Sequence, residues 1–289
     1  MRSRERFGYL LLAPALLVMG AFLLGPIAAA FVTSLHVDTP FAPRRFVGLE
    51  NYALLLEDEA ALGSLEFTLL FVVVSVALEV AGGLVVALVL DRWRRGQGLV
   101  RAAVLLPWAM PTVVAAVMWK YIFNDQYGLV NALMYGDALE RYQAWLAHPL
   151  GARAAIILAD VWKSTSFAAL LILAGLQAVP RELLEAARAD GAGPLRRLLW
   201  VRLPLIRPAI LVAVLFRTID ALRVFDLVYV MTRGAPAGAT DVLQFYGYQK
   251  MFPEQQFGYG AAVSVCVFLL ALGLSLLAMR LVGTRSWAR

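Results

Sequence analysis

Four charged side chains recur every three residues inside one apolar run in the second half of the chain: Arg217, Asp220, Arg223 and Asp226. On a helix, neighbours of opposite sign at this spacing lie within reach of one another, so the stripe can neutralise itself. Each charge near the centre of a membrane helix costs ~2.5–3.5 kcal/mol, whereas each large apolar side chain returns only ~0.3–0.6 kcal/mol. The stripe must therefore face protein or a wet cavity. It is a candidate for a solute path or for an interface between subunits, and a purely structural ion ladder would have the same sequence.

A second polar group, Asp160 and Lys163, lies in the preceding apolar run and is followed by three hydroxyl residues at 164–166. A neutral polyhydroxylated solute needs hydrogen-bond donors and acceptors in turn, and aromatic rings can stack on the C–H side of a sugar ring. The candidate rings are Trp162, Phe225 and Tyr229. The alternative is that the polar groups bond one helix to another, and Glu79 in an earlier run could pair in the same way. No nucleophile–base pair or metal-ligand spacing is present, so we predict no catalytic residue and no metal.

The runs that position these residues are long enough to cross a membrane. Hydrophobic residues make up 61% of the chain and charged residues 16%, against typical soluble values of ~45–50% and ~25%. A spanning helix needs about 20 mostly apolar residues, and these runs are far too long for barrel strands. We therefore predict an all-α polytopic membrane protein with six spans, at about residues 7–33, 63–90, 102–123, 153–179, 207–231 and 257–283.

The distribution of lysine and arginine predicts the orientation of the spans. With the amino terminus inside, sixteen of these residues fall on the cytoplasmic side and six on the opposite side. Both termini and the loop after the fourth span are then cytoplasmic. The net charge of +6 follows from this topology, so nucleic-acid binding is not predicted. The expected organisation is a first helix with an extracytoplasmic loop (1–62), a core of five helices with a cytoplasmic loop at 180–207 (63–283), and a tail (284–289).

The cytoplasmic loop carries turn signals at fixed places. Pro180 suits the first turn of a short helix, and Gly191 can end that helix in a left-handed cap. Pro194 then opens a second short helix, which we expect to end where Leu203 and Pro204 break it. The small side chains of residues 186 and 187 would let another protein approach closely, while a carboxylate beside them could meet an arginine of that partner. The alternative is an amphipathic connector on the lipid headgroups, which the basic residues suit but the acidic residues and glycines do not.

The order Glu185-Ala186-Ala187, three residues, Gly191, nine residues, Val201, one residue, Leu203-Pro204 resembles the EAA motif of permease subunits of bacterial ATP-binding-cassette importers. In that family this segment is a coupling helix that docks into a cleft of the ATPase subunit. The resemblance implies the type I importer permease fold. It assigns ATPase coupling to Glu185, Ala186, Ala187, Gly191, Leu203 and Pro204.

Residues 220–236, DALRVFDLVYVMTRGAP, resemble the maltose-type sugar permeases and in particular the smaller member related to trehalose importers. Arg233 departs from a turn that is often glycine-rich in that family. The resemblance implies a permease of the bacterial cytoplasmic (inner) membrane that forms a heterodimer with a second permease. Two ATPase subunits would hold ATP and Mg, and an extracytoplasmic solute-binding protein would deliver a disaccharide or oligosaccharide such as trehalose or maltose. The chain itself has no G-x-x-x-x-G-K-[ST] motif, so we expect it to bind no cofactor.

Two alternatives stay open from the residues alone. A glycerol-phosphate importer of the same class is possible because buried arginines can meet a phosphate as readily as they meet aspartates. An ion-coupled secondary transporter could use Asp160, Asp220 and Asp226 as proton sites, but it would have no reason for a docking loop.

Overall fold

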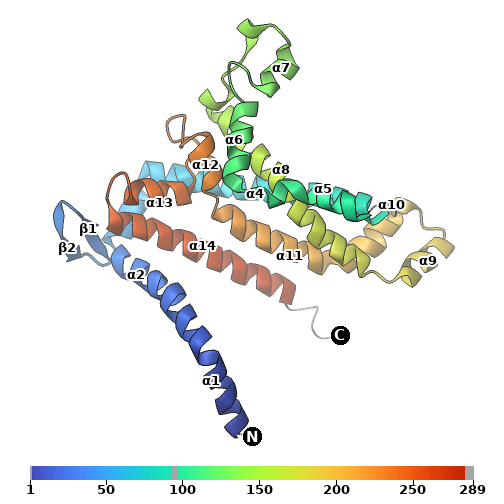
Figure 1. Ribbon diagram of the computed structural model, residues 1–289, viewed down its shortest axis with the longest axis horizontal. Coiled ribbons are helices and arrows are strands. Elements are labelled where there is room, and N and C mark those ends of the chain that lie inside the picture. Colours follow the sequence, from blue (N-terminus) through green and yellow to red (C-terminus); the bar gives the residue numbers. More distant parts are fainter. Residues whose placement is uncertain (1, 93–96, 284–289) are drawn as a thin grey trace. The chain divides into compact units, whose positions relative to one another are not determined.

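The computed structural model describes residues 2–92 and 97–283 and is mostly helical (Figure 1). Its elements in chain order are α1 (Arg2–Met19), the π-helical turn η1 (Gly20–Leu24), α2 (Gly25–Ser34), β1 (His36–Thr39), β2 (Ala42–Phe46), α3 (Glu50–Glu57), α4 (Glu59–Arg92), α5 (Gln97–Ala109), α6 (Thr112–Ile122), α7 (Leu129–Tyr135), the 3-10 turns η2 (Leu139–Arg141) and η3 (Trp145–Ala147), α8 (Pro149–Gln177), α9 (Arg181–Ala189), α10 (Pro194–Arg197), the π-helical turn η4 (Leu198–Arg202), α11 (Leu203–Leu222), α12 (Asp226–Met231), α13 (Leu243–Met251) and α14 (Phe257–Gly283).

Five helical stretches in the described part of the chain are long and apolar enough to cross a membrane: Leu11–Ser34, Glu59–Arg92, Pro149–Gln177, Pro194–Leu222 and Phe257–Leu277. A sixth is broken, because α5 and α6 meet at an angle of 85°. The prediction of six apolar spans is thus confirmed, but the third is not one continuous helix. Pro111 has no backbone N–H and disfavours a helical conformation at the residue before it, so α5 ends at Ala109 and α6 begins after Pro111.

The fifth predicted span, 207–231, is wrong at both ends. It begins earlier, because α10, η4 and α11 run on without a break from Pro194 to Leu222. The backbone N–H of Leu203 bonds to the carbonyl of Leu198, five residues earlier. This wide turn makes room for the ring of Pro204, which has no N–H to donate. The expected break at Leu203-Pro204 is therefore absent. The span also ends earlier, since α11 stops at Leu222 and α12 starts only at Asp226.

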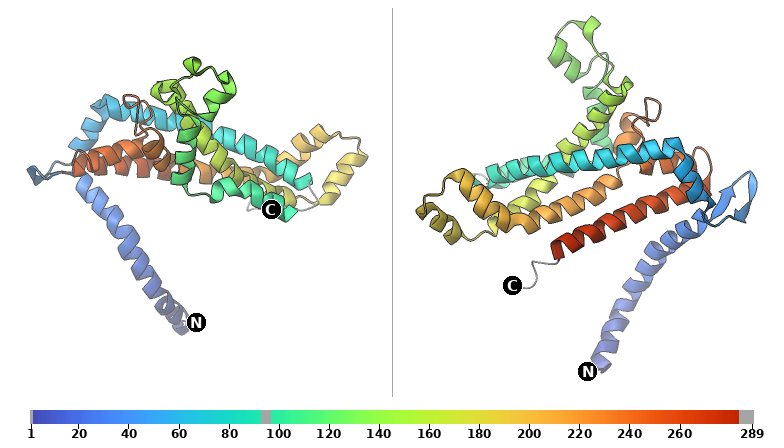
Figure 2. Two further views of the ribbon diagram at one scale, coloured as in Figure 1. Left: turned by 45° about the horizontal axis from the view of Figure 1, so that its top comes forward. Right: turned by 180° about the vertical axis from the view of Figure 1, so that it is seen from behind.

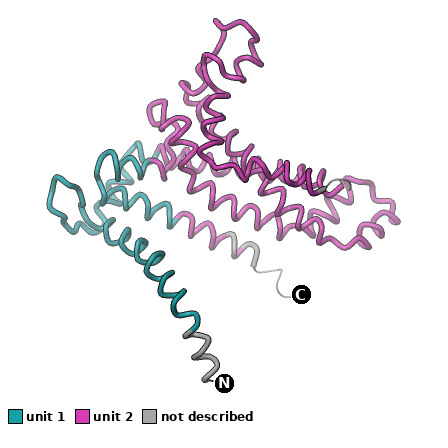
Figure 3. Tube along the Cα trace, viewed as in Figure 1, with its two compact units in different colours: residues 1–62, 246–269 teal, residues 63–245, 270–289 magenta. Residues whose placement is uncertain are grey.

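The chain forms two compact units, shown in teal and magenta in Figure 3. Unit 1 comprises residues 1–62 and 246–269 and contains the antiparallel β1–β2 hairpin. Asp58 organises this unit, because one of its carboxylate oxygens accepts hydrogen bonds from the hydroxyls of Tyr246 and Tyr259 and the other accepts them from the first turn of α4. Burial alone would raise the pKa of Asp58, but these four hydrogen bonds outweigh it and lower the pKa.

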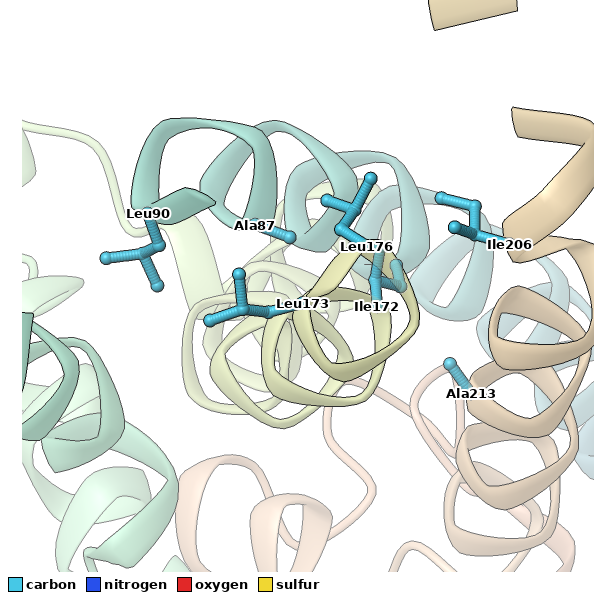
Figure 4. Packing of buried hydrophobic residues seen from close by; sticks show 7 residues of the cluster. All are labelled: Ala87, Leu90, Ile172, Leu173, Leu176, Ile206 and Ala213. Carbon is cyan, nitrogen blue, oxygen red and sulfur yellow. The ribbon is translucent and has the colours of Figure 1, made fainter. Parts of the chain in front are cut away.

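Unit 2 comprises residues 63–245 and 270–289, and its core lies between α4, α8 and α11. Small residues let these helices approach closely. A Cβ added at Gly83 would lie 2.9 Å from the Cβ of Ala168, and one added at Gly175 would lie 2.5 Å from the Cβ of Ala209. An apolar cluster fills the space between the helices and is drawn in Figure 4: Ala87, Leu90, Ile172, Leu173, Leu176, Ile206 and Ala213.

Within unit 2, the segment from α6 to α7 turns away from these packed helices, and α7 lies at its far end (Figures 1 and 2). Buried Asn131 holds this excursion together. Its amide nitrogen donates to the carbonyls of Asn124 (3.2 Å) and Gln143 (2.9 Å), and its amide oxygen accepts from the indole N–H of Trp145 (2.8 Å). Within this excursion, α7 covers residues 129–135.

Candidate functional site

A buried ion cluster in unit 2 joins the three central helices. Arg217 of α11 is 3% exposed, and its guanidinium binds Glu79 of α4 in a bidentate manner, with Nε 2.5 Å from Oε2 and Nη2 3.0 Å from Oε1. Nη2 also donates to Oδ2 of Asp160 in α8 at 3.2 Å. Nη1 donates to Oδ2 of Asp220, one turn along α11, at 2.8 Å. All three guanidinium nitrogens are therefore engaged by carboxylates.

The electrostatics of this cluster make it a unit whose members depend on one another. Glu79 and Asp160 are 0% and 7% exposed, so each would be an unpaired buried charge without Arg217. A planar guanidinium meets a carboxylate in a bidentate geometry that lysine cannot reproduce. The side chain of Asp220 is 72% exposed and is the one member that reaches open space. Asp160 receives a further hydrogen bond of 3.3 Å from the hydroxyl of Ser164.

The predicted stripe of four charges on one helix is only half present. Arg217 and Asp220 pair at the expected spacing of three residues. Arg223 follows the last residue of α11 and Asp226 begins α12, so these two do not continue the stripe, and both are exposed. The other partners of Arg217 come from two further helices. Glu79 is one of them and was expected only as a residue that could pair with another helix; its isolated charge in an apolar run was the available signal.

The remaining predicted residues fall into separate groups. Trp162 packs edge-on against Trp119 of α6, with ring centroids 5.9 Å apart. Phe225 and Tyr229 stack on each other at 5.4 Å, and both contact the ring of Phe245. The hydroxyl of Thr165 bonds back to the carbonyl of Val161 in its own helix, which is a bond within one helix and differs from the helix-to-helix bonding that the sequence left open. Lys163 is half-buried in α8.

Tyr229 links its aromatic pair to a cavity of about 430 Å³ between α6 and α12. Two cations, Lys120 and Arg233, line this cavity together with three tyrosines at positions 121, 127 and 229. The guanidinium of Arg233 lies 6.0 Å from the centre of the Tyr229 ring. Ligand sites fall in the range of about 300–1,000 Å³ and combine aromatic walls with a few polar groups. The sequence did not predict this cavity, because it depends on the side-by-side packing of two helices that lie a hundred residues apart.

The turn at residues 232–241, which contains Arg233, buries a carboxylate. Asp241 is 8% exposed, and its Oδ1 has no hydrogen-bond partner among the described residues. Burial raises the pKa of Asp241 from 3.8 to about 6. Gly234 has a φ of +84° and carries its Cα close to this carboxylate, since a Cβ there would lie 2.0 Å from Oδ1. The turn therefore accommodates a buried acid only with glycine at 234.

The loop after α8 has the geometry that its turn signals predict in its first half. Gly191 has a φ of +77° and ends α9 in a Schellman cap, with its N–H bonded to the carbonyl of Arg188 and the N–H of Ala192 bonded to the carbonyl of Ala187. Glu185 and Ala186 are exposed on α9. In its second half, Leu203 and Pro204 lie inside the continuous helix that reaches Arg217. The loop and the ion cluster are thus the two ends of one helical rod.

Comparison with known proteins places this geometry in context. The model of a family described as binding-protein-dependent transport system inner membrane component matches residues 79–285. The chain is 41% identical over 282 residues to the trehalose/maltose transport system permease protein MalF of Thermococcus litoralis, covering 97% of this chain and 95% of the relative. It is 40% identical over 284 residues to the trehalose transport system permease protein SugA of Mycobacterium tuberculosis, covering 97% and 90%.

The chain is also similar to a more distant relative and to a solved structure. The sn-glycerol-3-phosphate transport system permease protein UgpA of Agrobacterium fabrum is 32% identical over 285 residues, covering 96% of this chain and 94% of that protein. A chain of a bacterial ABC transporter involved in the import of the acidic polysaccharide alginate superposes with a TM-score of 0.85 at 21% identity, covering 98% of this chain and 97% of that chain. At that identity the likeness establishes the fold.

Proposed function

The chain belongs to the binding-protein-dependent transport system inner membrane components, and on this premise we propose that it carries a disaccharide or oligosaccharide, trehalose or maltose, across the membrane. As a member of this family it is a multi-pass inner-membrane transport subunit of an ABC importer and not an enzyme. An ATP-driven permease of this kind has no need of the proton sites that an ion-coupled secondary transporter would require. The substrates named for two relatives at 40% identity or more, trehalose and maltose, support a sugar.

The ion cluster favours a neutral solute over a phosphate ester. A phosphate would need free guanidinium donors, whereas every nitrogen of Arg217 is already bound by a carboxylate. The carboxylates of the cluster also offer a phosphate acceptors where it needs donors. Exposed Asp220 can instead accept hydrogen bonds from sugar hydroxyls at the open edge of the cluster. Of the other candidate path residues, Asp160 holds Arg217. We propose that the remaining ones line the walls of the path: Lys163, Trp162, Arg223, Phe225, Asp226 and Tyr229.

One observation favours the second candidate, a glycerol-phosphate importer. The cavity between α6 and α12 presents Lys120 and Arg233 with no carboxylate among its lining residues. A phosphate group could bind there before it reaches the cluster. The relative UgpA, at 32% identity, is consistent with this reading. The sugar remains the first proposal because the same cavity carries three tyrosine rings, which suit the C–H face of a pyranose.

We further propose that α9 is the element that receives the motion of an ATPase partner. The coupling residues are Glu185, Ala186, Ala187 and Gly191 on α9 and its cap, with Leu203 and Pro204 at the start of α11. The continuous helix from Pro194 to Leu222 supports this role, because a displacement of the loop would move Arg217 and its partners with it. ATP and Mg would be held by two ATPase subunits. A second permease and an extracytoplasmic solute-binding protein would complete the importer, and the solute path would open to one side at a time.

Uptake of labelled trehalose, maltose and glycerol 3-phosphate tests the substrate, in cells with and without this chain and with its partner subunits intact. Loss of disaccharide uptake alone supports the sugar. Loss of glycerol 3-phosphate uptake alone would instead support the second candidate, the glycerol-phosphate importer.

The coupling role is tested with Glu185→Arg, which should leave the chain inserted but abolish sugar-stimulated ATPase activity of the assembled importer. Glu182→Arg is the matched control, because it makes the same charge change on the exposed surface of the same helix outside the motif. Normal stimulation in the Glu185 variant would remove α9 from the proposed role.

A further inference from the structure

A large basic cavity lies where the loop meets the ends of α4 and α8 in unit 2. Its volume is about 1290 Å³. Five arginines line it, contributed by α4, α9, α10 and η4: Arg92, Arg181, Arg188, Arg197 and Arg202. The lining contains two carboxylates, Asp91 and Glu185, so five positive charges against two negative ones leave a formal charge of +3. The transport function proposed above uses Glu185 of this lining for ATPase coupling, but it uses none of the five arginines.

The hydrogen bonding around the cavity leaves a guanidinium donor unused. Arg202 is bound to Asp91, with Nη1 3.0 Å from Oδ2. The Nε of Arg197 is buried and has no hydrogen-bond partner among the described residues. A buried guanidinium donor without an acceptor is costly, and a guanidinium matches the oxygens of a phosphate in a fork geometry. The cavity therefore has both the charge and the free donor that an anionic group with several oxygens would satisfy.

Apart from Gln177, the rest of the lining is apolar. Leu88 and Leu176 come from the last turns of α4 and α8, and Leu195 and Leu198 come from the helix that follows the loop. In the next turn, the side chain of Trp200 is 79% exposed. Tryptophan is enriched at membrane–water interfaces, where its ring sits at the level of the headgroups. Because α4 and α8 are spans that end at this cavity, the arginines lie where hydrocarbon gives way to headgroups.

The cavity has a positive charge, a donor without an acceptor and apolar lining residues, and it lies at the membrane ends of two spans. We propose that it binds the phosphate headgroup of an anionic phospholipid such as phosphatidylglycerol, whose acyl chains would begin against the leucines. Basic pockets between membrane helices at the cytoplasmic side are sites of this kind. Of the coupling residues on α9 and its cap, Glu185 lines the cavity, whereas Ala186, Ala187 and Gly191 do not, so they leave another side of α9 open to the ATPase while a lipid is bound. The bound phosphate would hold α9 against the ends of α4 and α8. This proposal goes beyond the transport function and does not depend on the sugar.

The test measures lipid binding to the full chain. The chain is placed in nanodiscs of phosphatidylcholine mixed with phosphatidylglycerol, and the retained phospholipid is identified by native mass spectrometry. Arg181→Gln combined with Arg188→Gln removes two cavity charges from an exposed helix. The matched control combines Arg196→Gln with Arg207→Gln, which removes two exposed arginines of the following helix that do not line the cavity. An arginine near an anionic headgroup strengthens binding about five-fold, so the cavity variant, which lacks two, should bind phosphatidylglycerol about 25-fold more weakly, and the control should bind it like the wild type.

Four results would overturn the proposal. Equal retention of the two lipids by the wild type would mean that there is no anion site, and this measurement needs no variant to fold. Equal losses in the two double variants would assign the binding to diffuse surface charge. Displacement of phosphatidylglycerol by inorganic phosphate at constant ionic strength would identify free phosphate as the ligand. Release of the lipid on assembly with the ATPase subunits would make the cavity part of a protein interface.

Discussion

Replacing Arg217 by methionine should destabilise the chain far more than replacing the exposed carboxylate that it contacts. The variant would leave Glu79 and Asp160, 0% and 7% exposed, without their cation. Removing one partner of a buried ion pair costs about 3–5 kcal/mol, because the charge left behind is neither solvated nor paired. Asp220→Asn removes a carboxylate whose side chain is 72% exposed from the same guanidinium, and exposed pairs contribute about 0–1 kcal/mol.

The free energy of unfolding is measured by reversible denaturation in mixed detergent micelles, followed by circular dichroism and tryptophan fluorescence. Glu79→Gln combined with Arg217→Met completes a double-mutant cycle. We expect the double variant to be more stable than the sum of the two single losses predicts, since Arg217→Met strands both Glu79 and Asp160, whereas the double variant strands Asp160 alone. The reasoning is refuted if Arg217→Met loses no more stability than Asp220→Asn, or if the two single losses add.

Three further outcomes follow from the structure. Asp241→Asn should flatten the pH dependence of stability, because the pKa of Asp241 in the folded chain, about 6, is above the value of 3.8 for the free side chain. The wild type should therefore lose up to about 3 kcal/mol of its free energy of unfolding as the pH rises from 4 to 6 and the buried carboxyl ionises. Thermal unfolding across that range should show this loss in the wild type only. Gly175→Ala should lower the free energy of unfolding by about 1–3 kcal/mol, because the added methyl group overpacks against Ala209. Gly273→Ala in α14, where a Cβ would meet nothing within 4 Å, should raise the free energy of unfolding by about 0.5–1 kcal/mol. Equal changes in the two variants would contradict the close approach of α8 and α11. Gly191→Ala, at a φ of +77°, should destabilise the cap of α9 by about 1–2 kcal/mol, measured as faster amide exchange at Ala192; unchanged exchange would argue against the cap.

The features that the sequence predicts well are those decided over short distances along the chain. An apolar run of sufficient length crosses a membrane whatever its neighbours are, so the six runs could be located from hydropathy alone. The left-handed cap at Gly191 is equally local, because only the conformational freedom of glycine is needed there. The EAA-like spacing is also local, and the family to which it pointed is confirmed.

The features that sequence reasoning missed depend on contacts between distant segments or on weak local signals. Glu79 and Arg217 are 138 residues apart, so their pairing required knowledge that α4 and α11 are neighbours. The end of α11 at Leu222 has no proline or glycine to announce it, and the stripe was therefore extended too far. At Leu203-Pro204 the opposite error occurred, because a π-helical turn accommodates a proline that would otherwise break the helix.

The unbroken helix and its early end determine how the loop and the cluster relate. With a break at Leu203-Pro204, a displaced loop would have bent at that point and left the fifth span at rest. Because the helix is continuous, Arg217 stands about 35 Å along one rod from Pro194, at 1.5 Å per residue. That rod ends five residues after Arg217, so the cluster sits near its far end, and Asp160 and Glu79 tie this end to α8 and α4. A movement of the loop must therefore either carry all three helices together or break buried ion pairs. Since breaking them is costly, the geometry favours movement of the three helices as one body.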